Sequence, residues 1–126
     1  MRKLIAFFIL IFFTGIVLGN DLWIRVTESK TVKIDYMNGS YANFMYEGER
    51  FHASKFRWIQ NNEINVYIYM ISTKDCKRKA GTMAEANAAT NKFIQEYEFV
   101  IGSGNMASHI AQLICFQAKN AESSDL

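Results

Sequence analysis

The clearest structural signal in this chain is residues 51–72, which read FHASKFRWIQNNEINVYIYMIS. Two strand-like runs, 51–60 and 63–72, flank Asn61-Asn62, a pair typical of a tight turn. In the second run one set of side chains alternates with another: Ile64, Val66, Ile68 and Met70 against Asn65, Tyr67, Tyr69 and Ile71. Because both sets are largely apolar or aromatic, both faces of this strand should be buried. The segment therefore predicts an antiparallel hairpin at the centre of a sheet.

The residues before this hairpin predict three further strands. Apolar positions alternate in 22–28 and again in 31–36, with Ser29-Lys30 as the connection. The next residues, 37–40, contain Asn-Gly, the strongest short-range hairpin signal, because both residues tolerate a positive φ. We expect 41–46 to be the strand that returns from this second hairpin.

After residue 72 the pattern changes from strands towards a helix. Residues 75–80 predict a short polar strand that carries Cys76, whereas 82–90 is alanine-rich and fits either a short helix or a strand with a loop. Residues 93–101 alternate and predict a strand. Beyond the break at 102–104, helical spacing predicts a helix to about residue 118 with a buried stripe of Met106, Ile110, Leu113 and Ile114. The fold class is therefore α+β, an antiparallel sheet of about five to six strands covered by a C-terminal helix.

The N-terminus has the pattern of a secretory signal peptide. A basic start, Arg2-Lys3, precedes an apolar stretch over 4–18, followed by residues suited to cleavage before Asn20. A retained membrane anchor is the alternative, but the stretch is shorter than the roughly 20 residues that cross a bilayer. We expect residues 1–19 to be removed and 20–126 to form one exported domain in the periplasm or at the cell surface, without a stable membrane span.

Export determines how the two cysteines, Cys76 and Cys115, are interpreted. In an oxidising compartment such a pair normally forms a disulfide, and a bond that closes a loop of this length contributes about 4 kcal/mol to stability. A metal site is the weaker alternative, because only His52 and His109 could complete it with imidazoles. A nucleophilic Cys115 served by His109 is disfavoured, since their spacing places them on different faces of one helix.

Composition and charge exclude several classes of protein. The chain has 126 residues, 50% of them hydrophobic, and no proline, so it is neither collagen-like nor intrinsically disordered. Its 14 Lys and Arg against 12 Asp and Glu give a net charge of +2. The leader contains two of the basic residues, which leaves 12 against 12 in the exported part. A neutral domain lacks the basic footprint that nucleic-acid binding requires.

No complete catalytic signature is present, and the sequence predicts neither a cofactor nor a metal. Ser108 and His109 are adjacent, so on a helix they point apart instead of forming a nucleophile and base. Glu96 and Glu98 share a strand face and could act as an acid–base pair, but a solvated strand face is the favoured interpretation. We therefore expect no enzymatic activity.

Two groups of side chains are candidates for a binding patch. The first is the only run of charge, which either attracts an anionic partner or protects a sheet edge from pairing. The second is a pair of aromatic residues on one strand face, which either contact a partner or pack in the core. The residues are Lys74, Lys77, Arg78 and Lys79 in the first group and Tyr67 and Tyr69 in the second.

Several of these features together resemble the surface-adhesin protein E-like family of small exported bacterial proteins. The shared features are Trp23 at the start of the first strand, Ile34-Asp35-Tyr36, Trp58, Asp75-Cys76, and a last helix that reads ASHIAQLIC over 107–115. The resemblance implies an antiparallel sheet, a C-terminal helix and a two-cysteine bridge. It also implies a binding module whose named relative attaches to host matrix proteins, and it transfers no binding residue.

The favoured function is therefore an exported, non-enzymatic binding module of the bacterial envelope, with a host matrix or envelope protein as its partner. The alternative is a periplasmic inhibitor or immunity-like protein that inserts a loop, 37–41 or 102–105, into the cleft of a hydrolase. An enzyme that uses Cys115 or the Glu96 and Glu98 pair is the least favoured hypothesis.

Overall fold

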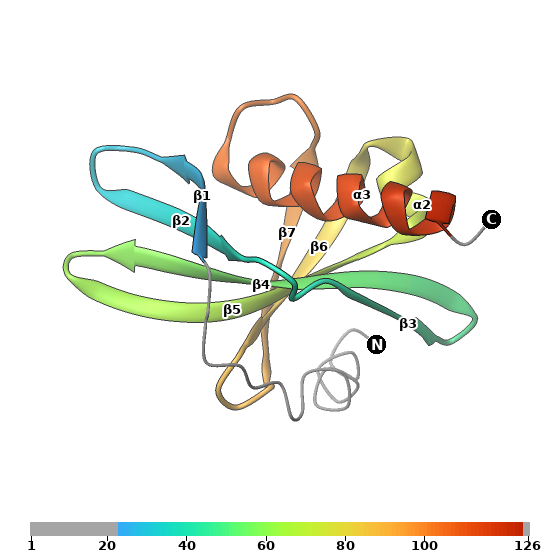
Figure 1. Cartoon of the computed structure of the whole chain (residues 1–126), viewed down its shortest axis with the longest axis horizontal. Coiled ribbons are helices and arrows are strands. Elements are labelled where there is room, and N and C mark those ends of the chain that lie inside the picture. Colours follow the sequence, from blue (N-terminus) through green and yellow to red (C-terminus); the bar gives the residue numbers. More distant parts are fainter. Residues whose placement is uncertain (1–22, 125–126) are drawn as a thin grey trace.

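The computed structural model describes residues 23–124, and the predicted leader with its cleavage point lies outside them. One antiparallel sheet of seven strands carries a long helix, α3, on one of its faces (Figure 1). The strand order is β1-β2-β4-β5-β6-β7, and β3 also pairs with β4. The elements are β1 (Trp23–Glu28), β2 (Val32–Met37), β3 (Ala42–Tyr46), β4 (Glu49–Gln60), β5 (Glu63–Ser72), α2 (Thr73–Arg78), β6 (Ala80–Asn87), β7 (Phe93–Val100) and α3 (Met106–Ser124).

The predicted fold class is confirmed, with a slightly higher number of strands. The hairpin β4–β5 lies at the centre of the sheet and is in register along its whole length, from Phe51 opposite Ser72 to Gln60 opposite Glu63. Asn61 and Asn62 form its turn, both with positive φ (54° and 64°). The additional strand is β6, in the alanine-rich segment that fitted either a helix or a strand.

The second predicted hairpin, at Asn38-Gly39, is wrong. The segment β3 does not return along β2: both pair with β4, with Tyr36 opposite Phe56 and Ala42 opposite Ala53. Residues 37–41 therefore bulge out of a nearly continuous strand, and the side chain of Ser40 holds the bulge by accepting a hydrogen bond from the amide of Lys55 at 2.9 Å. A glycine with positive φ (85° at Gly39) permits an outward bulge as readily as a chain reversal.

The predicted strand at 75–80 is also wrong, because this segment forms the short helix α2. Ser72 is its N-cap, and the Ser72 hydroxyl accepts a hydrogen bond from the amide of Asp75 at 3.1 Å. The helix ends at Lys79, which adopts the left-handed conformation at φ 63°. A serine followed three residues later by an acidic residue is a helix-start signal, and it explains why this short polar segment is a helix.

The hydrophobic core lies mainly between α3 and the sheet, on the side that we call the helix face. Ile110 and Ile114 of the predicted stripe are fully buried there against Ile34, Phe56 and Tyr69. Met106 and Leu113, the other members of the stripe, are partly buried.

A second, smaller cluster packs on the opposite side of the sheet, the far face. Its members are Phe44, Phe51, Ala53, Ile68, Met70, Ala84 and Ala86. Within this cluster the rings of Phe44 and Phe51 stack, with their centroids 5.7 Å apart. Both faces of β5 are thus buried from Ile68 to Ser72, as predicted. The start of the strand departs from the prediction, because Glu63, Ile64 and Asn65 are exposed beside the β4–β5 turn.

Candidate binding site

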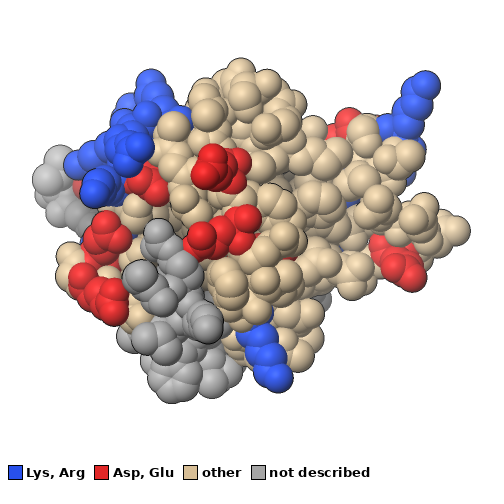
Figure 2. Space-filling view, turned by 180° about the vertical axis from the view of Figure 1, so that it is seen from behind, with Lys and Arg blue, Asp and Glu red and all other residues tan. Residues whose placement is uncertain are grey.

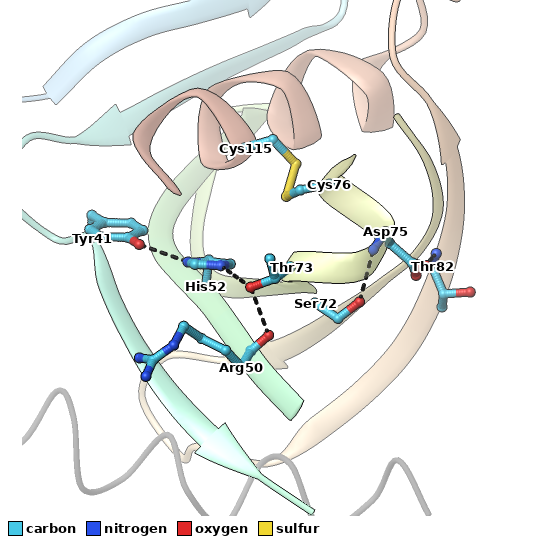
Figure 3. The surroundings of a disulfide bond; sticks show 9 residues. All are labelled: Tyr41, Arg50, His52, Ser72, Thr73, Asp75, Cys76, Thr82 and Cys115. Carbon is cyan, nitrogen blue, oxygen red and sulfur yellow. Dashed lines mark hydrogen bonds between the residues drawn. A yellow bond between two sulfur atoms is a disulfide. The ribbon is translucent and has the colours of Figure 1, made fainter. Parts of the chain in front are cut away.

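The predicted disulfide is confirmed and joins α2 to α3. Cys76 and Cys115 are bonded across 39 residues of sequence, with their Cα atoms 5.3 Å apart (Figure 3). No free cysteine exists in the described part of the chain, so neither sulfur is a thiol nucleophile in this state. The bond fixes the middle of α3 to the segment between the central strand β5 and β6.

The formation of α2 divides the predicted basic patch between two hollows. All four side chains of the patch are exposed, but a helical turn points them in different directions. Lys74 and Arg78 line a large hollow on the far face. Lys77 and Lys79 line a smaller groove between α2 and α3. Seen from behind, the largest group of basic side chains lies at the upper left, further ones lie at the upper right and at the bottom, and acidic side chains form several separate clusters (Figure 2).

The larger hollow, which we call the sheet hollow, has a volume of about 650 Å³. Buried side chains of the far face contribute to its floor, among them Phe51, Met70 and Ala84. Its exposed wall contains the two carboxylates of Glu96 and Glu98 on β7. The hollow therefore combines a small apolar floor with charges of both signs, since Lys74 and Arg78 line it too.

One corner of the sheet hollow is held by Asp75 of α2. Its carboxylate accepts a hydrogen bond from the amide of Thr82 at 3.1 Å and lies 3.5 Å from the guanidinium of Arg78. Gly81 is required beside it, because a Cβ at that position would be 2.2 Å from Cγ of Asp75. The contact positions α2 against the start of β6.

The buried His52 connects α2 to the bulge between β2 and β3 (Figure 3). The hydroxyl of Thr73 donates to the carbonyl of Arg50 at 3.3 Å, so it is free to accept a hydrogen bond from Nε2 of His52 at 2.7 Å. Nδ1 is then the acceptor for the hydroxyl of Tyr41, also at 2.7 Å. Burial is the main reason that the pKa of His52 is lowered to about 4. His52 is thus a neutral structural link, 1% exposed.

Of the two tyrosines in the predicted patch, Tyr69 is fully buried and Tyr67 is half-buried. Both pack on the helix face, where the hydroxyl of Tyr69 donates a hydrogen bond to the buried carboxylate of Glu85. Gln95 donates to the same carboxylate at 3.0 Å, and the hydroxyl of Tyr97 lies 3.4 Å from it. The pKa of Tyr69 is raised, mainly because the hydroxyl is buried and next because Glu85 is charged. The same two causes raise the pKa of Tyr97 to about 12.

Glu85 was missed by sequence reasoning, because it lies in the alanine-rich segment whose structure was ambiguous. Once that segment is recognised as β6, the alternation of side chains places Glu85 opposite Tyr69 on the helix face. The alternating glutamates of β7 did point to a shared surface, and Glu96 and Glu98 indeed lie together in the sheet hollow.

Comparisons with family models, curated proteins and solved structures give no match for this chain. Within the part of the chain that the structure describes, no group of three or more His, Cys, Asp or Glu side chains could hold a metal ion. None of the helices in residues 23–124 has the length and hydrophobicity to span a membrane.

Proposed function

We propose that this chain is an exported, disulfide-stabilised binding module of the bacterial envelope, without catalytic activity, that holds a protein partner in the sheet hollow. The observation that carries the proposal is the hollow itself, about 650 Å³, with an apolar floor and exposed charges on its wall. Apolar contact area at the centre with a polar rim is the usual anatomy of a protein-binding surface.

The residues of the hollow favour binding over catalysis. Neither His52 nor His109 is among its lining residues, so no imidazole base serves it. Glu96 and Glu98 are exposed, and an acid–base pair normally needs one carboxyl group that burial keeps protonated near neutral pH.

The charges of the hollow indicate the kind of partner. Glu49, Glu96 and Glu98 fit basic side chains of a partner segment, while Lys74 and Arg78 fit an acidic residue beside them. The resemblance to the surface-adhesin protein E-like family supports a host matrix or envelope protein as the source of that segment.

Export is supported by the leader pattern together with the disulfide between Cys76 and Cys115, a bond typical of oxidising compartments. The test is the intact mass of the protein recovered from the envelope fraction. We expect a chain that lacks residues 1–19 and is two hydrogens lighter than the dithiol form. A chain that retains the leader would favour an anchored protein instead.

Charge reversal tests the sheet hollow directly. We expect Glu96→Lys with Glu98→Lys to weaken binding to immobilised matrix or envelope proteins about tenfold, because repulsion replaces attraction at the rim. Glu63→Lys is the matched control, since Glu63 is an exposed strand residue at the β4–β5 turn, outside the hollow. Equal binding by the wild-type protein and the double variant would refute the proposal.

The inhibitor hypothesis is retained for one of its two loops. Residues 102–105 are all exposed in the turn between β7 and α3, as a loop inserted into an enzyme cleft requires. The bulge at 37–41 is fixed to β4 through Ser40, which makes it the weaker candidate. Co-purification of a hydrolase with the wild-type chain, but not with a variant in which 102–105 is replaced, would favour this second function.

A further inference from the structure

The groove between α2 and α3, which we call the basic groove, differs from the sheet hollow in its chemistry. It has a volume of about 420 Å³, within the usual range of small-molecule sites. Its apolar lining comprises the disulfide between Cys76 and Cys115, together with Ile101, Phe116 and Ala118. Phe116 is 60% exposed, so its ring is accessible to a molecule bound in the groove.

Three lysines line this apolar groove. Lys77 and Lys79 come from α2 and its C-cap, and Lys119 comes from the facing side of α3. All three side chains are exposed, and none forms an ion pair with another residue in 23–124. Glu122 is the only acidic residue among those lining the groove. The local charge is therefore positive, although the exported chain as a whole is neutral.

We propose that the basic groove binds a single-chain fatty acid, with the acyl chain along the disulfide and Phe116 and the carboxylate at the lysines. An apolar floor with a positive rim complements a molecule that has one apolar tail and one anionic head. The concave shape favours a single chain over a membrane surface. Docking to a bilayer requires apolar side chains that protrude, and of the apolar residues in this groove Phe116 alone is strongly exposed.

This site is independent of the proposed function, because no residue lines both the basic groove and the sheet hollow. The two sites lie on either side of α2, so one short helix contributes to both. Variants that affect one site can therefore leave the other unchanged.

Calorimetric titration with octanoate, decanoate and laurate, each below its micelle concentration, tests the apolar half of the proposal. We expect the affinity to rise about fourfold for each added methylene until the groove is filled, because each CH₂ that leaves water contributes a constant increment. Phe116→Ala should lower the affinity for laurate several-fold without loss of stability, since this side chain is largely in solvent.

The ionic half is tested by the lysines. We expect the triple variant Lys77→Gln, Lys79→Asn and Lys119→Gln to bind laurate at least tenfold more weakly. Asparagine is chosen at position 79 because it tolerates the left-handed backbone found there. Dodecyltrimethylammonium, with an equally long tail and a cationic head, should also bind at least tenfold more weakly than laurate. Lys30→Gln with Lys33→Gln and Lys92→Gln is the matched control, because it removes three exposed positive charges outside both sites, and it should bind laurate as the wild type does.

Three results would overturn the proposal. The first is no detectable binding of any of the three fatty acids by the wild-type protein. The second is equal binding of laurate and the cationic amphiphile, or laurate binding that the lysine variant leaves unchanged, because either would indicate unspecific apolar adsorption. The third is binding to vesicles of anionic phospholipid without binding to laurate, which would make the region a membrane-contact surface.

Discussion

The two faces of the sheet bury titratable side chains in different ways. On the helix face, Glu85 and His52 are hydrogen-bonded only to neutral groups in the described structure, mainly hydroxyls. On the far face, Asp35 lies between two guanidinium groups, those of Arg25 and Arg57. The difference does not come from depth, because Glu85 is 3% exposed and Asp35 is 2% exposed.

The two acids differ instead in how exposed to solvent the side chains that pair with them are. The side chains of Arg25 and Arg57 are 41% and 27% exposed, so both cations keep part of their hydration while they neutralise Asp35. Tyr69, one partner of Glu85, is fully buried, and a cation in that place would lose its hydration entirely. A second partner, Gln95, is exposed but uncharged. At Asp35, therefore, the cost of burying a charge pair is limited because both cations keep contact with water.

The largest expected effect comes from removing the bond that ties α3 to α2 over the helix face. Cys76→Ser with Cys115→Ser should lower the free energy of unfolding by about 4 kcal/mol, because the unfolded chain regains the entropy of an open loop. Urea denaturation of this variant against the oxidised wild type measures the loss. A loss below about 1 kcal/mol would indicate that packing alone holds the helix in place.

The neutral environment of His52 predicts a pH dependence that is specific to the helix face. The pKa of His52 is 6.5 in the unfolded chain and about 4 in the folded chain. At pH values between these two, the unfolded chain binds a proton that the folded chain does not. Stability should therefore fall by about 3 kcal/mol as the pH is lowered from 7 to 4. Denaturation curves across this range provide the measurement. His52→Gln should flatten the slope, and a slope that persists in this variant would assign it to other groups.

Removing the carboxylate of Glu85 tests the hydrogen bonds that it accepts from the hydroxyls of Tyr69 and Tyr97. We expect Glu85→Ala to cost about 2 kcal/mol, because the buried hydroxyl of Tyr69 loses its acceptor. Glu98→Ala is the matched control on the neighbouring strand; its side chain is exposed on the far face, so its effect should stay within about 0.5 kcal/mol. Similar losses for the two variants would contradict the distinction between the faces.

The smallest effect is expected at Asp35. Burial acts to raise its pKa, but hydrogen bonds from Arg25 and Arg57 outweigh burial and hold the pKa below its ordinary value. The resulting stabilisation is complete above the ordinary pKa of 3.8 and is lost as the pH falls through the lower folded value. Asp35→Asn should cost about 1 kcal/mol, since both arginines remain hydrated. Thermal unfolding near pH 7 measures this cost, and a loss larger than that of Glu85→Ala would reverse the comparison.

Much of the fold was predictable from local patterns. The hairpin over 51–72 and the apolar stripe of the last helix follow from side-chain periodicity, which each segment carries by itself. The two errors, at Asn38-Gly39 and at 75–80, occurred where one local signal fits two structures. A positive φ suits a bulge as well as a hairpin, and a short polar segment can be either a strand or a capped helix.

The candidate sites were less predictable than the fold. The residue types were present in the sequence: a basic run, paired glutamates and two cysteines. The pairing of the cysteines and the shared face of the glutamates were predicted, but the division of the basic run was not. Lys77 and Lys79 line one groove with Lys119 of α3, while Lys74 and Arg78 line the other hollow with Glu96 of β7.

The sequence by itself determined the strands at the centre of the sheet, the helix that covers them and the pairing of the only two cysteines. These depend on the period of apolar residues and on the number of thiols, properties that need no knowledge of distant contacts. Only the tertiary structure decided which charges share a hollow and which acids are buried. The first property depends on the direction in which α2 turns between β5 and β6, and the second on how the strands and α3 pack against one another on the two faces of the sheet.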